Sequence, residues 1–311
     1  MHGVLIVDKP AGPTSHDVVA RVRRAIGISR IGHTGTLDPL ATGVLALVVG
    51  RATRLAQFLS SDEKQYVAGV RLGWATATYD AEERTGRGER GELIVQPPQR
   101  PAPAIGEAEI REALTAFVGS YAQLPPPFSA KKIGGTPAYL LARLQKDVEL
   151  KPAGVTVKAL ELVALDEGLA TLRIVCSSGF YVRSLAHDLG ERLGCGAHLE
   201  SLRRTHTGDF TLAESTPLDV VMAEGVEALR RLLPLPSLLP KLPRVVVNAR
   251  GAKRAAHGNA LATEDLSEDD ASTLAATQDP GPIRVLDADG ALLAIGQRGH
   301  GGVLQPVVVL V

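Results

Sequence analysis

The sequence is poor in the residues that build disulfide frameworks and metal sites. Its 311 residues include two cysteines, Cys176 and Cys195, which do not form a C-x-x-C pair. The eight histidines form no H-x-x-x-H or H-E-x-x-H pattern, so we expect neither a disulfide scaffold nor a zinc site. No Walker phosphate-binding loop occurs either. We therefore expect the protein to hold no metal and to need no cofactor.

Long apolar runs and an excess of charge of either sign are also missing. No segment approaches membrane-spanning length and no signal-peptide pattern begins the chain, so we expect a cytoplasmic protein without membrane contact. Lys and Arg together number 34, as do Asp and Glu. The charges are unevenly distributed, since residues 1–59 and 121–160 each carry a net +4 and residues 80–112 a net −3. This asymmetry fits a basic face for nucleic acid, and it fits ordinary solvated surface charge equally well.

The length and composition indicate two domains. The chain exceeds the usual size of one domain, and its 45% of apolar residues suffices for a sizeable core. Four prolines between positions 234 and 243 break the chain after a helix predicted at 223–233. We therefore predict a first domain at residues 1–238 and a second at 241–311.

The apolar periodicity predicts a mixture of strands and helices. In the first domain, strands are expected at residues 4–7, 44–49, 66–72, 155–165 and 170–176. Helices are expected at 15–26, with Ser15 as the N-cap, and at 53–59, 110–117, 138–146, 182–193 and 223–233. Residues 80–106 are rich in Gly, Pro and charge and are expected to be an exposed loop. In the second domain we expect a hairpin of 283–286 and 291–295 around Asp289-Gly290, and a last strand at 307–311.

One carboxylate, Asp38, stands in a loop of small and uncharged residues. Gly32, Gly35 and Gly43 permit backbone angles that other residues resist. Pro39 fixes its own φ and favours an extended conformation at the residue before it. The loop leads into an apolar run that is typical of a buried strand. An acid held in this way suits a nucleophile or a base, although Asp-Pro is also an ordinary turn former.

A second group of candidate residues lies where a predicted strand ends and a helix starts. Arg183 falls in the first turn of that helix, where the helix dipole disfavours a cation that lacks an anionic partner. Asp38 is one candidate partner, and Asp188 or solvent is the other. Tyr66, at the start of a predicted strand, could stack on a base or belong to the core. His33 could contact a phosphate or a base.

These residues fall in segments that resemble the motifs of bacterial tRNA pseudouridine-55 synthases, the TruB family. The segment around Asp38 reads Gly32-His33-Thr34-Gly35-Thr36-Leu37-Asp38-Pro39-Leu40-Ala41-Thr42-Gly43. The other similar segments are Leu5-Ile6-Val7-Asp8-Lys9-Pro10, Lys64-Gln65-Tyr66, Pro125-Pro126-Pro127-Phe128-Ser129-Ala130, Cys176-Ser177-Ser178-Gly179-Phe180-Tyr181-Val182-Arg183, and Gly194-Cys195-Gly196-Ala197-His198-Leu199 with Leu202-Arg203-Arg204. Because these segments come in the family's order and span about residues 3–210, coincidence is a poor explanation.

The resemblance implies a fold and a reaction. The fold would be α+β, with a mixed-sheet pseudouridine synthase catalytic domain at 1–238 and a small C-terminal β-rich, PUA-like domain that binds RNA at 241–311. The reaction would convert uridine 55 in the T-loop of tRNA to pseudouridine, with the target base flipped out of its stack. The partner would be the tRNA T-stem-loop, with no obligatory protein partner, and the enzyme would be a monomer.

The resemblance also assigns roles to individual residues. Asp38 would be the catalytic aspartate, Arg183 its ionic partner in catalysis, and Tyr66 the ring that stacks on the target base. Further substrate-binding residues would be His33, Tyr181, Leu202, Lys9, Lys131 and Lys132. The last two belong to a basic, proline-stiffened segment at about 123–150 that would grip the RNA.

Some features depart from the family's pattern, and two other functions stay open. Thr36 stands where Ala is common, Phe128 where Tyr is common and Lys131 where Leu is common. The chain could be a subunit of an RNA-guided pseudouridine synthase, or a non-catalytic factor that binds or folds tRNA. The proline-rich segment at 123–150 favours the stand-alone bacterial type, and the intact catalytic motif argues against a purely binding role.

Overall fold

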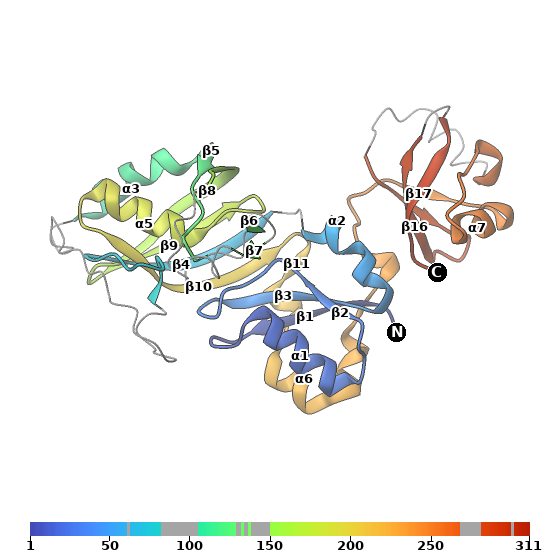
Figure 1. Cartoon of the computed structure of the whole chain (residues 1–311), viewed down its shortest axis with the longest axis horizontal. Coiled ribbons are helices and arrows are strands. Elements are labelled where there is room, and N and C mark those ends of the chain that lie inside the picture. The colour runs from blue at the N-terminus through green and yellow to red at the C-terminus, as the bar shows by residue number, and fades with distance from the viewer. Residues whose placement is uncertain are drawn as a thin grey trace.

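Two sheets dominate the computed structural model, which describes residues 1–60, 63–81, 105–128, 132–133, 136–137, 150–267, 281–299 and 302–311. The larger is an 11-stranded mixed sheet and the smaller a four-stranded sheet near the C-terminus. Figure 1 shows helices such as α1, α3, α5 and α6 lying along the large sheet, and the small sheet forming, with α7, a separate β-rich domain at one end of the molecule. The expected α+β fold with a small C-terminal domain is confirmed. The exact boundary between residues 238 and 241 stays a prediction.

The large sheet is built from segments that are far apart in the chain. Its hydrogen-bonded order is β12-β1-β3-β10-β4-β9-β8-β5, and β2, β11 and β13 pair with β3, β10 and β1. The strands are β1 (Gly3–Lys9), β2 (Ile31–Thr34), β3 (Thr42–Val49), β4 (Lys64–Leu72), β5 (Gly119–Gln123), β8 (Ala153–Asp166), β9 (Leu169–Cys176), β10 (Ala197–Thr207), β11 (Phe210–Thr211), β12 (Thr216–Pro217) and β13 (Leu233–Pro234). The pairs β1–β12 and β3–β10 are parallel, so the sheet is mixed.

The remaining elements cover this sheet or form the smaller ones. The helices are α1 (Ser15–Ile26), α2 (Ala56–Ser60), α3 (Glu107–Leu114), α5 (Val182–Leu193), α6 (Leu218–Glu224) and α7 (Ala249–Ala256). The C-terminal sheet contains β14 (Arg244–Val246), β15 (Ile283–Leu286), β16 (Leu292–Arg298) and β17 (Leu304–Val309), in that order. A two-stranded ribbon pairs β6 (Lys132–Ile133) with β7 (Thr136–Pro137).

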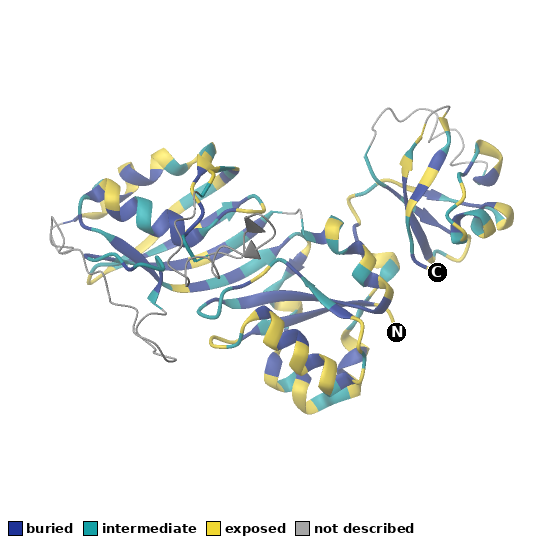
Figure 2. Ribbon diagram, in the orientation of Figure 1, coloured by how far each residue is buried: buried dark blue, intermediate teal, exposed yellow. Residues whose placement is uncertain are grey.

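Alternate residues of the inner strands enter two different hydrophobic cores. On β1, Leu5 and Val7 belong to the main core, which also includes apolar residues of α1, α3 and α5. Val4 and Ile6 belong to a second core, shared with α2 and with residues of the C-terminal sheet. Figure 2 shows the resulting buried band along the strands and the exposed outer faces of the helices. Burial on both faces explains why β1 and β3 read as continuous apolar runs rather than as alternating ones.

Most of the predicted elements are present, with corrections to their ends. The five strands predicted in the first domain appear as β1, β3, β4, β8 and β9, and the predicted hairpin appears as β15 and β16. The helix predicted at 223–233 is wrong, because α6 ends at Glu224 and Gly225, with φ +58°, leads into a 3₁₀ helix, Gly225–Arg231. The helix predicted at 138–146 lies outside the described residues.

Two further expectations need correction for reasons of local chemistry. The N-cap of α1 is Thr14 rather than Ser15: the Thr14 hydroxyl accepts from the Asp17 amide at 3.0 Å, and the Asp17 carboxylate accepts from the Thr14 amide at 2.9 Å. This reciprocal pair satisfies two of the amides that a helix start leaves unpaired. The expected exposed loop at 80–106 is also wrong at its edges, since Asp80 and Ile105 are buried.

Candidate active site

The Asp38 loop connects β2 to β3 and is fixed by two glycines with left-handed backbone angles. Gly35 has φ +80° and Gly43 has φ +100°. A Cβ atom added at Gly43 would lie 2.2 Å from the carbonyl oxygen of Arg204, so only glycine allows β3 to approach β10 this closely. Gly32, by contrast, lies within β2, and no left-handed angle is recorded there.

Side chains from two other elements hold the loop from within the protein. Ser15, the first residue of α1, donates its hydroxyl to the carbonyl of Leu37 at 3.0 Å and accepts from the Leu37 amide at 2.8 Å. Lys9, at the end of β1, donates its Nζ to the carbonyls of Pro39 and Ala41 at 3.2 and 2.7 Å. These bonds satisfy loop groups on either side of Asp38.

The position of Lys9 changes its expected role. Its side chain is completely buried, and an amine without exposed surface cannot reach an RNA phosphate. The structure therefore places Lys9 beneath the Asp38 loop as a support, and not among the residues that line the cavity beside Asp38.

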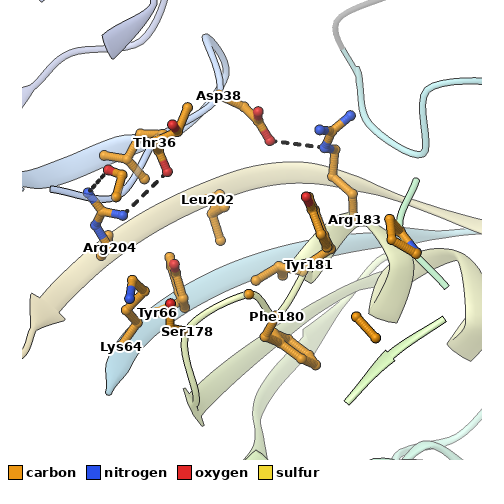
Figure 3. Close-up of a pocket in the computed structure, with 16 residues that line it drawn as sticks. Thr36, Asp38, Lys64, Tyr66, Ser178, Phe180, Tyr181, Arg183, Leu202 and Arg204 are labelled. Atoms are coloured by element: carbon orange, nitrogen blue, oxygen red, sulfur yellow. Dashed lines mark hydrogen bonds and ion pairs between the residues drawn. The ribbon is translucent and has the colours of Figure 1, made fainter. Parts of the chain in front are cut away.

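Arg204 is a third support, and periodicity alone gave no reason to expect it. It projects from β10 and is fully buried. Its Nε donates to the carbonyl of Val44 at 2.8 Å and its Nη2 to that of Gly35 at 3.0 Å. Figure 3 shows the guanidinium below the loop, on the opposite side of the pocket from Arg183. The loop is thus bound to strands on both sides of it.

Arg183 lies beside two carboxylates. Its Nε is 3.0 Å from Oδ2 of Asp38, and its Nη1 is 3.5 Å from Oδ2 of Asp80. The Nε–H does not aim at the Asp38 oxygen well enough for a hydrogen bond, so this contact is an ion pair. The other donors bind the carbonyls of Thr78 at 3.2 Å and Phe128 at 3.0 Å. Of the two candidate partners, the structure therefore brings Asp38 to Arg183.

The two carboxylates differ in exposure. The Asp80 side chain is 3% exposed and the Asp38 side chain 37% exposed, while that of Arg183 is 7% exposed. Asp80 also accepts from the Thr78 hydroxyl at 2.7 Å. Asp80 thus holds the Arg183 guanidinium from inside the protein, while one side of the Asp38 carboxylate is accessible to a ligand.

The open side of Asp38 faces a cavity of about 440 Å³. Figure 3 shows Tyr66 from β4, Leu202 from β10 and Tyr181 from the start of α5 around it, with Asp38 at one edge. Among the described residues, the lining consists of Gly35, Thr36, Leu37, Asp38, Lys64, Tyr66, Pro125, Ala153, Ser178, Gly179, Phe180, Tyr181, Val182, Arg183, Leu202 and Arg204. Three cations and several flat apolar side chains thus surround one carboxylate, which suits an anionic ligand with a planar ring.

Tyr66 and His33, both expected to bind substrate, have different positions. Tyr66 is buried in the cavity wall, and burial raises the pKa of its phenol although the Arg204 charge opposes the shift. His33 lies on β2 outside the cavity lining and packs edge-on against His16, with ring centres 5.3 Å apart. Burial, followed by the His16 and Arg204 charges, lowers the pKa of His33 to about 4, so the ring is neutral at neutral pH.

The expected phosphate contacts cannot be placed. Lys131 lies outside the described residues, and Lys132 belongs to β6, where no side chain is described. Most of the segment at 123–150 is likewise outside the described part of the chain. Within that part, no three metal-ligating side chains come together and no helix is long and apolar enough to cross a membrane.

Comparison with known proteins identifies the class of this site. Residues 23–182 match the TruB family pseudouridylate synthase N-terminal domain, and residues 183–239 match the tRNA pseudouridylate synthase B C-terminal domain. A protein named tRNA pseudouridine synthase B from Solibacter usitatus is 41% identical over the full length of both chains. A protein of the same name from Thermobifida fusca is 42% identical over 99% of this chain and 98% of that one.

Solved structures show the same fold at lower identity. A chain from an H/ACA RNP bound to a substrate RNA containing 2′-deoxyuridine has a TM-score of 0.70 and 24% identity, covering 99% of this chain and 85% of that one. A chain from a Cbf5-Nop10-Gar1 complex has a TM-score of 0.69 and 26% identity, covering 95% and 78%. The fold and the site define a pseudouridylate synthase, an isomerase that acts on uridine. Within this class, the chain belongs to the TruB family, which confirms the resemblance drawn from its motifs.

Proposed function

We propose that this enzyme converts uridine 55 in the T-loop of tRNA to pseudouridine, with Asp38 as the catalytic residue. The observation that carries the proposal is the position of Asp38. Among the described residues it is the one carboxylate that lines the cavity, it is partly exposed, and it is held by a rigid loop and a buried arginine. The name that the relatives share, tRNA pseudouridine synthase B, supports tRNA as the substrate. Maturation of tRNA in bacteria takes place in the cytoplasm, where we expect the enzyme to act.

The reaction needs no group that this cavity does not offer. The N1–C1′ bond of uridine breaks, the base turns, and a C5–C1′ bond forms. The C5 proton leaves to solvent and N1 takes one up, so the reaction is an isomerisation without redox change. Attack of a carboxylate at the sugar carbon and attack at the base both require Asp38 in its ionised form, and the Arg183 guanidinium compensates that charge.

The walls of the cavity suit a base that has left its stack. Flipping a base out costs roughly a few kcal/mol, and stacking on an aromatic ring returns about 1–3 kcal/mol per base. We assign that ring to Tyr66, which is fixed by burial, and the apolar floor to Leu202 and Tyr181. Lys64 and Arg204 also line the cavity and add positive charge to its wall from within the protein, since both side chains are buried.

We also propose a division of labour along the chain. Residues 1–238 carry the chemistry, the segment at about 123–150 grips RNA, and the PUA-like domain at 241–311 binds RNA outside the T-loop. Every catalytic and cavity-lining residue named above lies before position 205. The partner is the tRNA T-stem-loop, and we expect a monomer that needs no protein partner.

The test follows from the fate of the C5 hydrogen. A tRNA transcript carrying [5-³H]uridine should release tritium when treated with the enzyme, and a transcript with cytidine at position 55 should release none. Asp38→Asn should release none from either, while binding the first transcript with wild-type affinity. Tritium release from the cytidine-55 transcript would refute uridine 55 as the target. Turnover by Asp38→Asn well above background would refute the assignment of Asp38 as the catalytic residue.

One other function shares the fold and is decided by the same assay. The solved structures above are an H/ACA RNP bound to a substrate RNA and a Cbf5-Nop10-Gar1 complex, which favours an RNA-guided subunit as the second candidate. The identity to those chains is 24–26%, against 41–42% for the two proteins named tRNA pseudouridine synthase B. Tritium release from a bare transcript without guide RNA or added protein would exclude the guided mechanism. Tight binding of tRNA without any release would instead indicate a binding or folding factor.

A further inference from the structure

The turn that carries Asp80 has a tyrosine in an unfavourable backbone conformation. Tyr79 has φ +66°, a left-handed angle that a bulky residue rarely adopts. Its amide donates to the carbonyl of Thr76 at 3.2 Å, and the Thr76 hydroxyl donates to the carbonyl of Asp80 at 2.8 Å. The conformation reverses the chain and directs the Asp80 carboxylate inward, to Arg183.

Tyr79 is held in this conformation by a ring on the helix that carries Arg183. The rings of Tyr79 and His187 are stacked, with centres 3.9 Å apart and planes 6° from parallel. His187 follows Arg183 by four residues in α5, so the two side chains lie one helical turn apart on the same face. The turn is therefore attached to α5 by a stack at Tyr79 and by the contacts of Arg183 with Thr78 and Asp80.

The turn is fixed on its other side by the sheet. The Leu199 amide of β10 donates to the carbonyl of Tyr79 at 2.9 Å, and Asp80 forms a bridge with Leu199. The backbone is thus pinned to β10, while the stack on α5 is the contact that a side-chain substitution can remove. Losing it frees the Tyr79 backbone to relax toward φ below zero, which turns the Asp80 carboxylate away from Arg183.

We propose that Tyr79 is a positioning residue, which by stacking on His187 keeps Asp80 on Arg183 and thereby keeps Arg183 on Asp38. The inference rests on the proposed function, because Asp38 gives this arrangement its purpose. Tyr79 is not in the cavity lining, so its effect reaches the reaction only through Asp80 and Arg183. It should influence the chemical step and leave RNA binding unchanged.

Three single substitutions separate the stack from the fold. Tyr79→Ala removes the ring and keeps the Cβ atom that makes a positive φ unfavourable, Tyr79→Phe keeps the ring, and His187→Ala removes the stacking partner from the other side. We expect Tyr79→Ala and His187→Ala to lower the single-turnover rate at saturating tRNA about tenfold, with the dissociation constant within about twofold of wild type. Tyr79→Phe should retain the wild-type rate within about twofold.

A double variant distinguishes positioning from a general structural effect. In the Asp80→Asn background, Tyr79→Ala should lower the rate no further, because it acts through the same carboxylate. If the two losses multiply, or if Tyr79→Ala and His187→Ala both turn over like wild type, the proposal is wrong. Unfolding midpoints of all variants show whether each is folded at the assay temperature.

A spectroscopic measurement tests the turn without any reaction. Trp74 is the only tryptophan of the chain. It lies five residues before Tyr79, with its ring centre 5.5 Å from that of His198. Tyr79→Ala should increase quenching of its fluorescence by acrylamide, and Tyr79→Phe should not. Unchanged quenching in Tyr79→Ala would refute the claim that the stack holds the turn. An inactive wild-type enzyme would refute the proposed function, and the quenching result would then decide the positioning claim alone.

Discussion

Replacing Arg183 by methionine removes one cation from two carboxylates of very different exposure. Asp80 is 3% exposed and 3.5 Å from Nη1, and at an effective dielectric constant of about 20 this attraction is about 5 kcal/mol. Asp38 is closer, at 3.0 Å, but its side chain is 37% exposed, so solvent reduces its attraction to about 1 kcal/mol. The stability therefore depends mainly on the longer contact. We expect Arg183→Met to lower the free energy of unfolding by about 3–5 kcal/mol.

The assay is urea denaturation of Arg183→Met, Asp80→Asn and the double variant. Asparagine keeps the shape of Asp80 and removes its charge, so the double variant should be more stable than Arg183→Met by about 2 kcal/mol. Turnover should depend on the contact of Arg183 with Asp38, so Arg183→Met and the double variant should both be nearly inactive. Arg183→Lys should have intermediate activity, because it keeps the charge without the planar geometry. A loss below about 1 kcal/mol in Arg183→Met, or no recovery in the double variant, would refute this reasoning.

Three further predictions concern the supports of the loop. Gly43→Ala places a Cβ atom against the Arg204 carbonyl and should lower the free energy of unfolding, measured by urea denaturation, by more than about 3 kcal/mol. In the control Gly32→Ala, the new Cβ atom meets only a side-chain methyl at 3.4 Å, so the loss should be less than about 1 kcal/mol. Lys9→Met leaves loop carbonyls without their donor, so it should lower the free energy of unfolding by about 2–3 kcal/mol and lower the turnover. The salt dependence of tRNA binding should stay as in wild type, because Lys9 does not contact a phosphate. The pKa of His33 is about 4 in the folded protein against about 6.5 when unfolded, so the unfolded state binds the proton first and stability falls as the pH drops from about 6.5 to 4. His33→Gln should remove about 1–2 kcal/mol of that loss between pH 7 and pH 5, and an unchanged pH dependence would show that the folded protein does not keep His33 neutral in this range.

The residues predicted from sequence were those with a local signal. Glycines and a proline around Asp38 indicated a rigid loop, and a cation in the first turn of α5 indicated an anionic partner. Both signals depend on short-range backbone chemistry, which a sequence displays directly. The pairing of Arg183 with Asp38 rather than with Asp188 depends on how α5 packs against the sheet, and the sequence left that choice open.

The residues that were missed owe their positions to tertiary contacts. Asp80 stands at the start of a stretch rich in glycine, proline and charge, which is the usual composition of an exposed loop. β10 is a central strand of the sheet. Apolar periodicity did not predict it as a strand, because it contains four polar or charged residues, His198, Glu200, Arg203 and Arg204. Arg204 can be buried there only because backbone carbonyls from β3 and the Asp38 loop receive its hydrogen bonds. In the sequence, Arg204 stood out only as part of the Leu202-Arg203-Arg204 segment that resembles a family motif. That resemblance gave no physical reason for its burial.

The dependence of the Asp38 loop on Arg204 has a consequence for synthesis on the ribosome. The bonds from Arg204 to Val44 and Gly35 join residues 160 and 169 positions apart. At about 5–20 residues per second, the loop leaves the ribosome roughly 10–30 s before its support exists. During that time β1 and β3 can pair as neighbours, but Gly35 and Gly43 have nothing to close against. The Asp38 loop therefore reaches its folded geometry only after β10 has docked, and on the proposed function no shorter folding intermediate can act on RNA.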